Sequence, residues 1–324
     1  MDRRVATAGI LAIAGAPRRS MAQASRIPRV VVLLSGTATS DAARVDAFRR
    51  ALRDLGYSQG QNIAVEYMYA NGNVDQLDPL AAQVVSQADV VVAAGSTASR
   101  AVRKANGSIP IVMAFSSDPV AAGLADSLAH PGGNTTGLSL QATDLNAKQL
   151  EILKRIVPQL TSVAVLGYPQ GPTYRTRMQE IDRASGALSL RIQRVDVHDS
   201  ADLPAAFASI QGARPGAVLV LQSPPVVALQ SQIADFGLRA RLPTMYIDSE
   251  FPDLGGLASY GPDYADMFRR SATFVDKVLR GAKPRDLPVE QVERFELVIN
   301  LKTAKRIGLQ IPSSVRLQAS RVIE

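Results

Sequence analysis

The sequence predicts an α/β protein with two lobes, each built around a parallel β-sheet that carries helices on both faces. Short runs of β-branched residues alternate with amphipathic helical stretches, which is the pattern of a parallel sheet with crossover helices. The pattern restarts after residue 143, so two such lobes are expected. The 324 residues, 46% of them hydrophobic, are enough for one large or two medium domains.

The first series of elements begins with a strand-like run at 29–35. A helix is predicted at 41–57 because Val45, Phe48 and Leu52 recur on one helical face. The series continues with strands at 62–70, 89–95 and 109–115 and with helices at 74–87 and from Ser96 onward. A short helical piece, a Gly-rich turn and another β-prone run ending near Leu140 are expected next.

The second series begins with a helix at 145–158 and keeps the same alternation. It predicts strands at 162–168, 189–197, 216–222 and 242–247 and helices at 173–188, 201–211 and 226–240. The tail adds a strand at 255–261, a long helix at 263–281, a Pro-rich link, a strand at 294–300 and a last helix at 301–308. A chain that passes between the lobes more than once accommodates these extra elements.

Residues 1–24 have the features of an export signal. A positive start at Arg3 and Arg4 is followed by an apolar run at 5–16 and by small residues around Ala24. Two further arginines before the cleavage position are atypical, and the alternative is a buried first helix, but no polar face repeats at helical spacing. We therefore expect a soluble periplasmic protein whose signal peptide is removed near Ala24.

Charge and cysteine content exclude several classes of protein. Removal of residues 1–24 takes away four arginines and one aspartate and lowers the formal charge from +7 to +4. The remaining basic residues are scattered, so no nucleic-acid partner is expected. The chain has no cysteine, which excludes disulfides, thiolate catalysis and a lipid-modified N-terminal cysteine. It also has no apolar run long enough to span a bilayer.

Small polar residues follow the predicted strands, at the edge where open parallel sheets bind their ligands. The candidate ligand-binding residues are Ser35, Gly36, Thr37, Ser96, Thr97, Ser116, Ser117 and Asp118 in the first lobe and Tyr168, Gln222, Ser223 and Asp248 in the second. Hydroxyls, amides and a few carboxylates suit a small polar ligand.

Several of these candidates also have a purely structural interpretation. Ser96 and Thr97 open a helix, where free N–H groups and the helix dipole attract a carboxylate or phosphate, but both residue types are also common helix caps. Asp118 precedes a proline and suits a turn cap or a ligand contact. Asp248 is expected to pair with an ammonium group or to be a loop carboxylate. Tyr168 is expected to stack on a ligand ring or to close the hinge.

Motifs typical of enzymes are missing from the sequence. It contains no G-x-S-x-G elbow, no G-x-x-x-x-G-K-[ST] loop and no G-x-G-x-x-G after the first strand. The two histidines, His130 and His198, are expected to face solvent rather than a metal ion. We therefore expect binding without turnover, with no cofactor and no metal site.

Three long blocks of this chain resemble one known family. They are DPVAAGLADSLAHPGGNTTGLS at 118–139, GGLASYGPDYADMFRRSATFVDKVLRGAKPRDLP at 255–288 and LPVEQVERFELVINLKTAKRIGLQIP at 287–312. The blocks closely resemble the substrate-binding proteins of the ABC-transporter family whose members include tryptophan- and tyrosine-binding proteins. The resemblance runs from about residue 28 to 320, and it is specific because long ordered blocks match.

The resemblance implies a type I periplasmic-binding-protein fold, with two Rossmann-like lobes joined by three crossovers and the ligand between them. The crossovers are expected near 140–143, 248–255 and 282–289. The corresponding first lobe consists of residues 25–141 and 255–282, and the second of residues 142–254 and 283–324. A monomer is expected.

The resemblance also implies roles for the candidate residues. In members that hold aromatic amino acids the first-lobe strand ends grip the polar end of the ligand. By position this role falls on Ser96, Thr97 and the Ser116-Ser117-Asp118 run, while Asp248 would neutralise an ammonium group. Many members have a proline near the first strand end, whereas this chain has SGTATS, so the pocket for the ligand's side chain can differ.

The function implied is that of a periplasmic solute-binding protein of an ABC importer. It would capture a small carboxylate-bearing ligand, with an aromatic amino acid or aromatic acid favoured, and deliver it to a membrane permease and its ATPase. The alternative is a periplasmic sensor that passes its ligand signal to a receptor. An enzyme is a third, weaker alternative, because nothing in the sequence supplies a nucleophile, metal site or cofactor loop.

Overall fold

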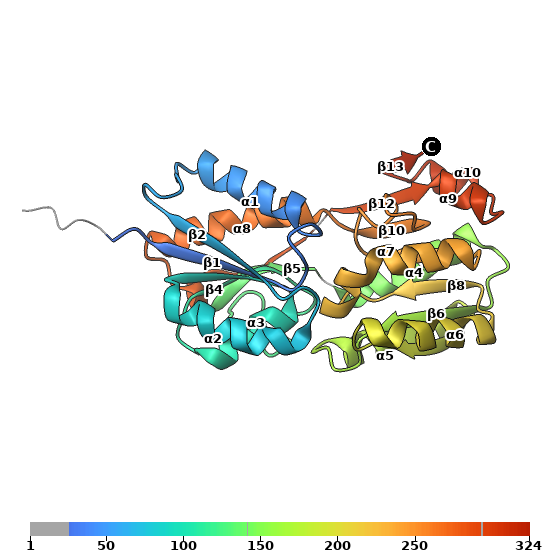
Figure 1. The fold of residues 1–324 in the computed structure, drawn as a ribbon, viewed down its shortest axis with the longest axis horizontal. Helices are drawn as coiled ribbons and strands as arrows, with labels where there is room; N and C mark the ends of the chain where they lie inside the picture. Colours follow the sequence, from blue (N-terminus) through green and yellow to red (C-terminus); the bar gives the residue numbers. More distant parts are fainter. Residues whose placement is uncertain (1–25, 141, 293) are drawn as a thin grey trace, which may run out of the picture.

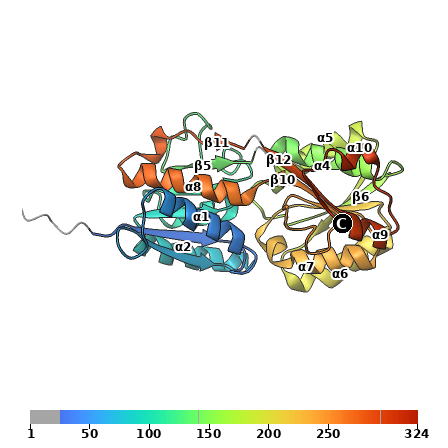
Figure 2. The ribbon, with the colours of Figure 1, turned by 90° about the horizontal axis from the view of Figure 1, so that it is seen from above.

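The computed structural model describes residues 26–140, 142–292 and 294–324 and shows two α/β lobes side by side (Figures 1 and 2). This arrangement confirms the expected fold class. The expected signal peptide, residues 1–24, lies outside the described residues. Within the described residues, no helix combines the length and the apolar character that a membrane crossing requires.

The first lobe contains a six-stranded sheet with the strand order β11-β5-β4-β3-β1-β2. All of its strand pairs are parallel. Its strands are β1 (Arg29–Leu34), β2 (Ala64–Tyr69), β3 (Val90–Ala94), β4 (Ile111–Ser116), β5 (Thr135–Ser139) and β11 (Glu290–Gln291). The neighbouring strands β1, β3 and β4 therefore end at the same edge, which faces the second lobe (Figure 1).

Helices cover both faces of this sheet. The side chains of Val30 and Val32 in β1 point to a core shared with α1 (Ala42–Asp54) and α8 (Tyr264–Leu279). Those of Val31 and Leu33 point to the opposite core, shared with α2 (Leu77–Gln87) and α3 (Ser96–Ala105). A strand buried on both faces needs an unbroken apolar run, which is what β1 and β3 contain.

The second lobe contains a seven-stranded sheet with the order β13-β12-β10-β9-β8-β6-β7. Its strands are β6 (Ser162–Gly167), β7 (Arg191–Asp196), β8 (Ala217–Val220), β9 (Thr244–Tyr246), β10 (Ala258–Pro262), β12 (Phe295–Asn300) and β13 (Arg321–Ile323). The expectation of parallel sheets holds here with one exception, since β12 runs antiparallel to β10. The short strands β11 and β13 are missing from the sequence-based prediction, because two or three residues carry too little pattern.

Helices also cover both faces of the second sheet. One face carries α6 (Leu203–Ala213) and α7 (Pro224–Arg239). The other carries α4 (Ala142–Ile156), α5 (Tyr174–Ala187), α9 (Leu301–Arg306) and the unexpected α10 (Ser313–Arg316). Single 3-10 turns at Val74–Gln76, Ser200–Asp202 and Pro284–Asp286 complete the elements of the described chain.

The chain passes between the lobes after β5, after β10 and after β11. The first crossing lies where it was expected, but the predictions for the second (248–255) and third (282–289) are wrong. Strand β10 pairs with β9 and β12, so the segment up to Pro262 belongs to the second lobe. Strand β11 pairs with β5, so the chain stays with the first lobe until Gln291. Figure 2 shows α8 beside α1 on the first lobe, while β10 and β12 lie in the second.

The segment between β4 and β5 contains turns instead of the short helix that was expected. The Asp118 carboxylate accepts hydrogen bonds from the backbone N–H groups of Val120 (3.0 Å) and Ala121 (2.9 Å), which closes a turn. The small apolar residues that follow pack against Met113 and Val289. This segment therefore covers the edge of the first sheet.

Candidate ligand-binding site

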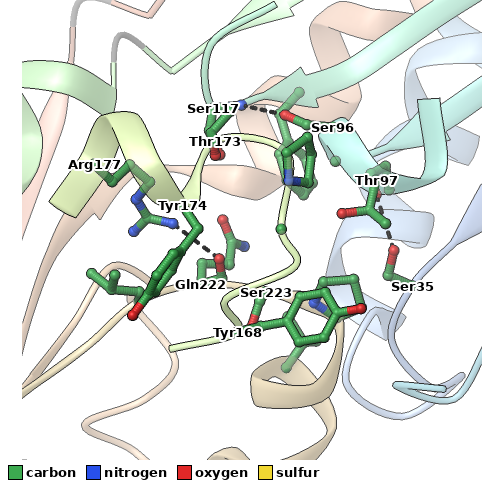
Figure 3. A pocket seen from close by; sticks show the side chains of 18 residues that line it. Ser35, Ser96, Thr97, Ser117, Tyr168, Thr173, Tyr174, Arg177, Gln222 and Ser223 are labelled. Atoms are coloured by element: carbon green, nitrogen blue, oxygen red, sulfur yellow. Dashed lines mark hydrogen bonds between the residues drawn. The ribbon is translucent and has the colours of Figure 1, made fainter. Parts of the chain in front are cut away.

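A cavity lies between the two lobes, next to the carboxyl ends of their central strands (Figure 3). Its empty volume is about 560 Å³, part of which is open to solvent. Small-molecule sites in proteins favour the carboxyl ends of parallel strands. The first lobe contributes residues from the ends of β1, β3 and β4, and the second lobe contributes the ends of β6 and β8 with the first turns of α5 and α7.

The first-lobe wall is organised around the start of α3. The Ser96 hydroxyl lies 2.8 Å from the Ser116 hydroxyl and accepts a hydrogen bond from the Ser117 N–H at 3.1 Å. These bonds tie the end of β4 to the start of the helix. The first N–H groups of a helix have no acceptor within the helix and carry a partial positive charge. The wall formed by Ser96 and Thr97 is therefore suited to an anionic group.

Gly95 sets the direction in which α3 leaves β3. Its backbone has φ 95° and ψ 157°, a conformation that is strained for any residue with a Cβ atom. A Cβ added here would also contact the Phe115 ring at 3.4 Å. The start of α3 therefore depends on glycine at this position.

Replacing Gly95 with alanine is expected to lower the free energy of unfolding by about 1–3 kcal/mol, the usual cost of such a backbone conformation. Urea unfolding measures the change. Gly107→Ala is the matched control, because a Cβ at Gly107 would contact nothing within 4 Å. An effect of Gly95→Ala no larger than that of the control would contradict this account.

The second-lobe wall contains a buried cation, Arg177, from the first turn of α5. Its Nε donates to the Asn146 side-chain oxygen (3.0 Å) and one terminal nitrogen donates to the Gln222 carbonyl (3.0 Å). Only 6% of the residue is exposed. In the part of the chain whose side chains the structure describes, no carboxylate lies within ion-pair distance of it. Burial lowers the pKa of Arg177, and smaller electrostatic effects that include Glu180 oppose this shift.

Two further polar groups on this wall lack partners among the described residues. The amide nitrogen of Gln222 and the hydroxyl of Ser223 are buried and make no hydrogen bond. The other amide atom of Gln222, Oε1, accepts a hydrogen bond from the Tyr264 hydroxyl at 2.7 Å, which fixes the amide so that its nitrogen remains a donor. Buried polar groups without a partner are costly, so a ligand that bonded to them would be stabilised.

The rest of the cavity wall is apolar or aromatic. Phe115, Leu221 and Val227 line it together with the rings of Tyr168 and Tyr174. The Tyr174 hydroxyl donates to Asp196 at 3.1 Å. Burial and that carboxylate raise the pKa of Tyr174 to about 12, so the phenol is neutral at physiological pH. The wall thus combines an apolar surface with a few polar groups, as small-molecule sites do.

The structure brings together seven of the twelve candidate residues at this cavity: Ser35, Ser96, Thr97, Ser117, Tyr168, Gln222 and Ser223. The other five do not line it. Gly36 and Thr37 belong to a turn closed by Ser40. Ser116 is fully buried behind Ser96, and Asp118 caps the turn described above.

Asp248, the expected partner of an ammonium group, is buried away from the cavity. Its carboxylate forms an ion pair with Arg44 of α1, and the same guanidinium binds Asp41 at 2.7 Å. Each of these three side chains is only 3% exposed. Burial alone would lower the pKa of Arg44, but the two carboxylates raise it above its ordinary value. The geometry therefore corrects the ammonium role expected for Asp248.

The Arg44–Asp248 pair also joins the two lobes. Arg44 belongs to α1 of the first lobe, and Asp248 follows β9 of the second. The ring of Tyr264 lies against the guanidinium at 4.6 Å. Since Tyr264 also bonds to Gln222, this buried cluster connects directly to the cavity wall.

Both histidines lie outside the cavity. His130 is exposed in the turn before β5. His198 is half-exposed, and its Nδ1 lies 2.8 Å from the Asp202 carboxylate, a partner four residues on that the sequence-based expectation overlooked. Among the described residues, no group of three or more potential metal-binding side chains comes together.

Sequence reasoning missed Arg177, and a signal for it existed. Tyr174, Arg177, Met178 and Ile181 recur at helical spacing on the buried face of α5. An arginine within an otherwise apolar helical face is expensive to bury and therefore indicates a buried partner or a ligand. Arg44 stands in the same position on the buried face of α1.

Comparisons with known proteins agree with this architecture. A family model described as ABC transporter substrate binding protein matches residues 29–323. The chain is 27% identical over 270 residues to the tyrosine-binding protein of Clostridioides difficile strain R20291, which covers 81% of this chain and 76% of that protein.

Two solved structures share the fold. A conserved domain protein from Vibrio cholerae O1 biovar eltor superposes with a TM-score of 0.85 at 26% identity, covering 92% of this chain and all of the other. An ABC domain from Streptococcus pneumonia in complex with L-Trp superposes with a TM-score of 0.84 at 24% identity, again covering 92% of this chain and all of the other.

Proposed function

Since this chain belongs to the ABC transporter substrate-binding protein family, we propose that it captures a small carboxylate-bearing molecule between its lobes and delivers it to a membrane permease. An aromatic acid or aromatic amino acid is the favoured ligand class. Capture takes place in the periplasm after removal of the signal peptide. The permease and its ATPase are the partners that this role requires.

The observation that carries the proposal is the Arg177 guanidinium in the cavity wall. It is buried, and two of its nitrogens are held by Asn146 and the Gln222 carbonyl. A ligand carboxylate would provide the counter-charge and would accept a charge-assisted hydrogen bond, which is roughly twice as strong as a neutral one. The start of α3 on the opposite wall, at Ser96 and Thr97, favours the same charge.

The apolar part of the wall supports an aromatic ligand. Tyr168 and Phe115 offer ring faces or edges, and Leu221 and Val227 add apolar surface to the same cavity. Aromatic pairs contribute about 0.5–1.5 kcal/mol beyond the burial of their area. The tyrosine-binding protein is a relative of this chain, and the structure in complex with L-Trp shares its fold. Both support an aromatic ligand.

Closure of the two lobes is the step that links capture to delivery. Walls from both lobes line the cavity, so separation of the lobes about the three connecting segments would widen the path for a ligand. The ligand binds the closed form better because only that form offers both walls, and it shifts the equilibrium by that difference in affinity. The closed form then presents surfaces of both lobes to the permease.

A thermal-shift screen tests the proposal. Residues 25–324 would be denatured, refolded without ligand and screened against aromatic acids, amino acids, sugars and nucleosides. A ligand present at about 100 times its Kd is expected to add about 2.7 kcal/mol to the stability, which appears as a rise of several degrees in Tm. Small-angle X-ray scattering should show a smaller radius of gyration with that ligand.

Stabilisation by sugars or nucleosides with no response to any carboxylate would contradict the proposal. Delivery has a separate test, uptake of the radiolabelled ligand by proteoliposomes that contain the permease and ATPase encoded beside this protein. Binding without stimulated uptake would favour the sensor alternative.

A further inference from the structure

We infer that the ligand is an organic anion with a carboxylate and an aromatic ring but no ammonium group. The inference rests on the proposed function and specifies the ligand class further. An amino acid is a zwitterion, so its site needs one set of partners for the carboxylate and another for the ammonium group, supplied by charges or by hydrogen bonds. The cavity described here offers one of them.

The described wall of the cavity carries a positive but no negative formal charge. Among the described residues that line it, Arg177 alone carries a formal charge, and none is an aspartate or glutamate. Burying an ammonium group without a carboxylate costs several kcal/mol unless hydrogen bonds replace its water. A zwitterion would pay this cost here, and an anion would not.

Three of the described carboxylates around the site pair with protein groups. Asp248 and Asp41 share the Arg44 guanidinium, and Asp196 accepts the Tyr174 hydroxyl. Moving Asp248 toward a ligand would leave Arg44 with one buried carboxylate instead of two. The cluster therefore keeps its negative charge away from the cavity.

Among the uncharged groups of the wall, several carbonyl oxygens already accept hydrogen bonds while one amide donor is free. The Gln222 carbonyl accepts from Arg177, and its side-chain oxygen accepts from Tyr264. The Ala94 carbonyl accepts from the Ser35 hydroxyl at 3.4 Å, and the Tyr168 carbonyl accepts from the Gly171 N–H. The Gln222 amide nitrogen, in contrast, makes no hydrogen bond. Free donors suit the oxygens of a carboxylate, and an ammonium group would need acceptors.

The surface beside the cavity carries more positive than negative side chains. A second hollow shares Thr97 and Tyr168 with the cavity and is lined by Arg100, Arg103 and Lys104, with two aspartates beside them. Lys104 pairs with one of these aspartates, and Arg103 donates to a backbone carbonyl. Arg100 takes part in none of the ion pairs of the described chain. An excess of positive side chains beside the cavity raises the local concentration of an anion at low salt.

Three probes with the same phenyl ring separate these charge types: 3-phenylpropanoate, L-phenylalanine and 2-phenylethylamine. The first carries only a carboxylate, the second both groups, and the third only the ammonium group. Isothermal titration calorimetry on the refolded chain at pH 7 is expected to show 3-phenylpropanoate binding at least about tenfold more tightly than phenylalanine, a difference of about 1.4 kcal/mol. The amine should not bind.

A charge added to the cavity wall should reverse this order. Ser223 precedes the two prolines that begin α7, and aspartate is as good as serine at a helix N-cap, so Ser223→Asp is compatible with the fold. The new carboxylate would lie on the cavity wall beside the ligand. Ser223→Asp is expected to bind phenylalanine more tightly than 3-phenylpropanoate, whereas the neutral Ser223→Asn control keeps the original order.

The outcomes separate this inference from the proposed function. Tighter binding of phenylalanine than of 3-phenylpropanoate to the unmodified protein would overturn the inference and leave a carboxylate-binding protein. An unchanged order in Ser223→Asp would also overturn it, since the wall charge would then not decide the preference. Failure of both carboxylates to bind would overturn the aromatic-carboxylate class altogether.

Discussion

Replacing Arg177 with glutamine is expected to weaken the binding of a carboxylate ligand by about thirtyfold or more, while the fold is kept. The guanidinium is buried in the cavity wall and held by Asn146 and the Gln222 carbonyl, so little further ordering is needed when a carboxylate arrives. Removal of one partner from a buried, hydrogen-bonded charge pair usually costs 2–5 kcal/mol of binding free energy. Glutamine retains donors for one of the two protein contacts but carries no charge.

The effect of Arg177→Gln on the free energy of unfolding is expected to be smaller than its effect on ligand binding. In the ligand-free protein the substitution removes a buried cation, which offsets part of the lost hydrogen bonding. The unfolding free energy should therefore change by only about 1 kcal/mol. Calorimetric titration and urea unfolding on the same sample separate the two effects.

The matched control for this experiment is Arg175→Gln. Arg175 lies on the same helix with the same charge, but it is exposed and does not line the cavity. Its replacement should leave the affinity within about twofold, the change expected when a distant exposed charge is screened by salt. Equal losses in the two variants would show that general charge, and not the buried guanidinium, decides affinity.

The fold could be predicted where single elements carry a strong pattern. Strand β1 consists of apolar residues that are buried on both faces, and α1 repeats apolar residues at helical spacing, so both were recognisable. The assignment of elements to lobes was harder. Strand β10 looks alike whether it pairs with β5 or with β9, and only tertiary pairing places it in the second lobe. The two crossings that were misplaced both depend on such pairings.

The candidate site could be predicted in part, for a related reason. Parallel strands of one sheet end at one edge, so the residues that follow β3 and those that follow β8 lie at the ligand-binding edge of their own sheets, whatever their side chains do. This rule found Ser96, Thr97, Gln222 and Ser223. The rule could not decide which polar side chains turn toward the cavity. Asp118 instead accepts backbone hydrogen bonds, and Asp248 instead forms an ion pair with Arg44.

The ion pair between Arg44 and Asp248 joins the two lobes in the arrangement described here. Arg44 is buried between Asp41 of its own lobe and Asp248 of the other, and the ring of Tyr264 shields it from water. In this position the guanidinium compensates two carboxylates at once. Without it, two buried negative charges would face each other across the interface.

Replacing Arg44 with methionine is therefore expected to lower the free energy of unfolding by about 3–5 kcal/mol, as when one partner of a buried pair is removed. Urea unfolding measures the loss. Arg50→Met on the exposed face of α1 is the control and should cost less than about 0.5 kcal/mol. A variant that also carries Asp41→Asn and Asp248→Asn should recover most of the stability, because no buried charge remains uncompensated.

The loss in Arg44→Met is also expected to depend on pH. Burial already raises the pKa of Asp41, and Arg44 opposes that rise, so the pKa climbs further when the arginine is removed. A carboxyl whose folded pKa lies above its unfolded value favours the folded state below the unfolded value and loses that contribution as pH rises through the folded pKa. The deficit of Arg44→Met relative to the unmodified protein should thus be larger at pH 7 than at about pH 4. A deficit that stayed constant over this range would show that lost packing, and not uncompensated charge, destabilises the variant.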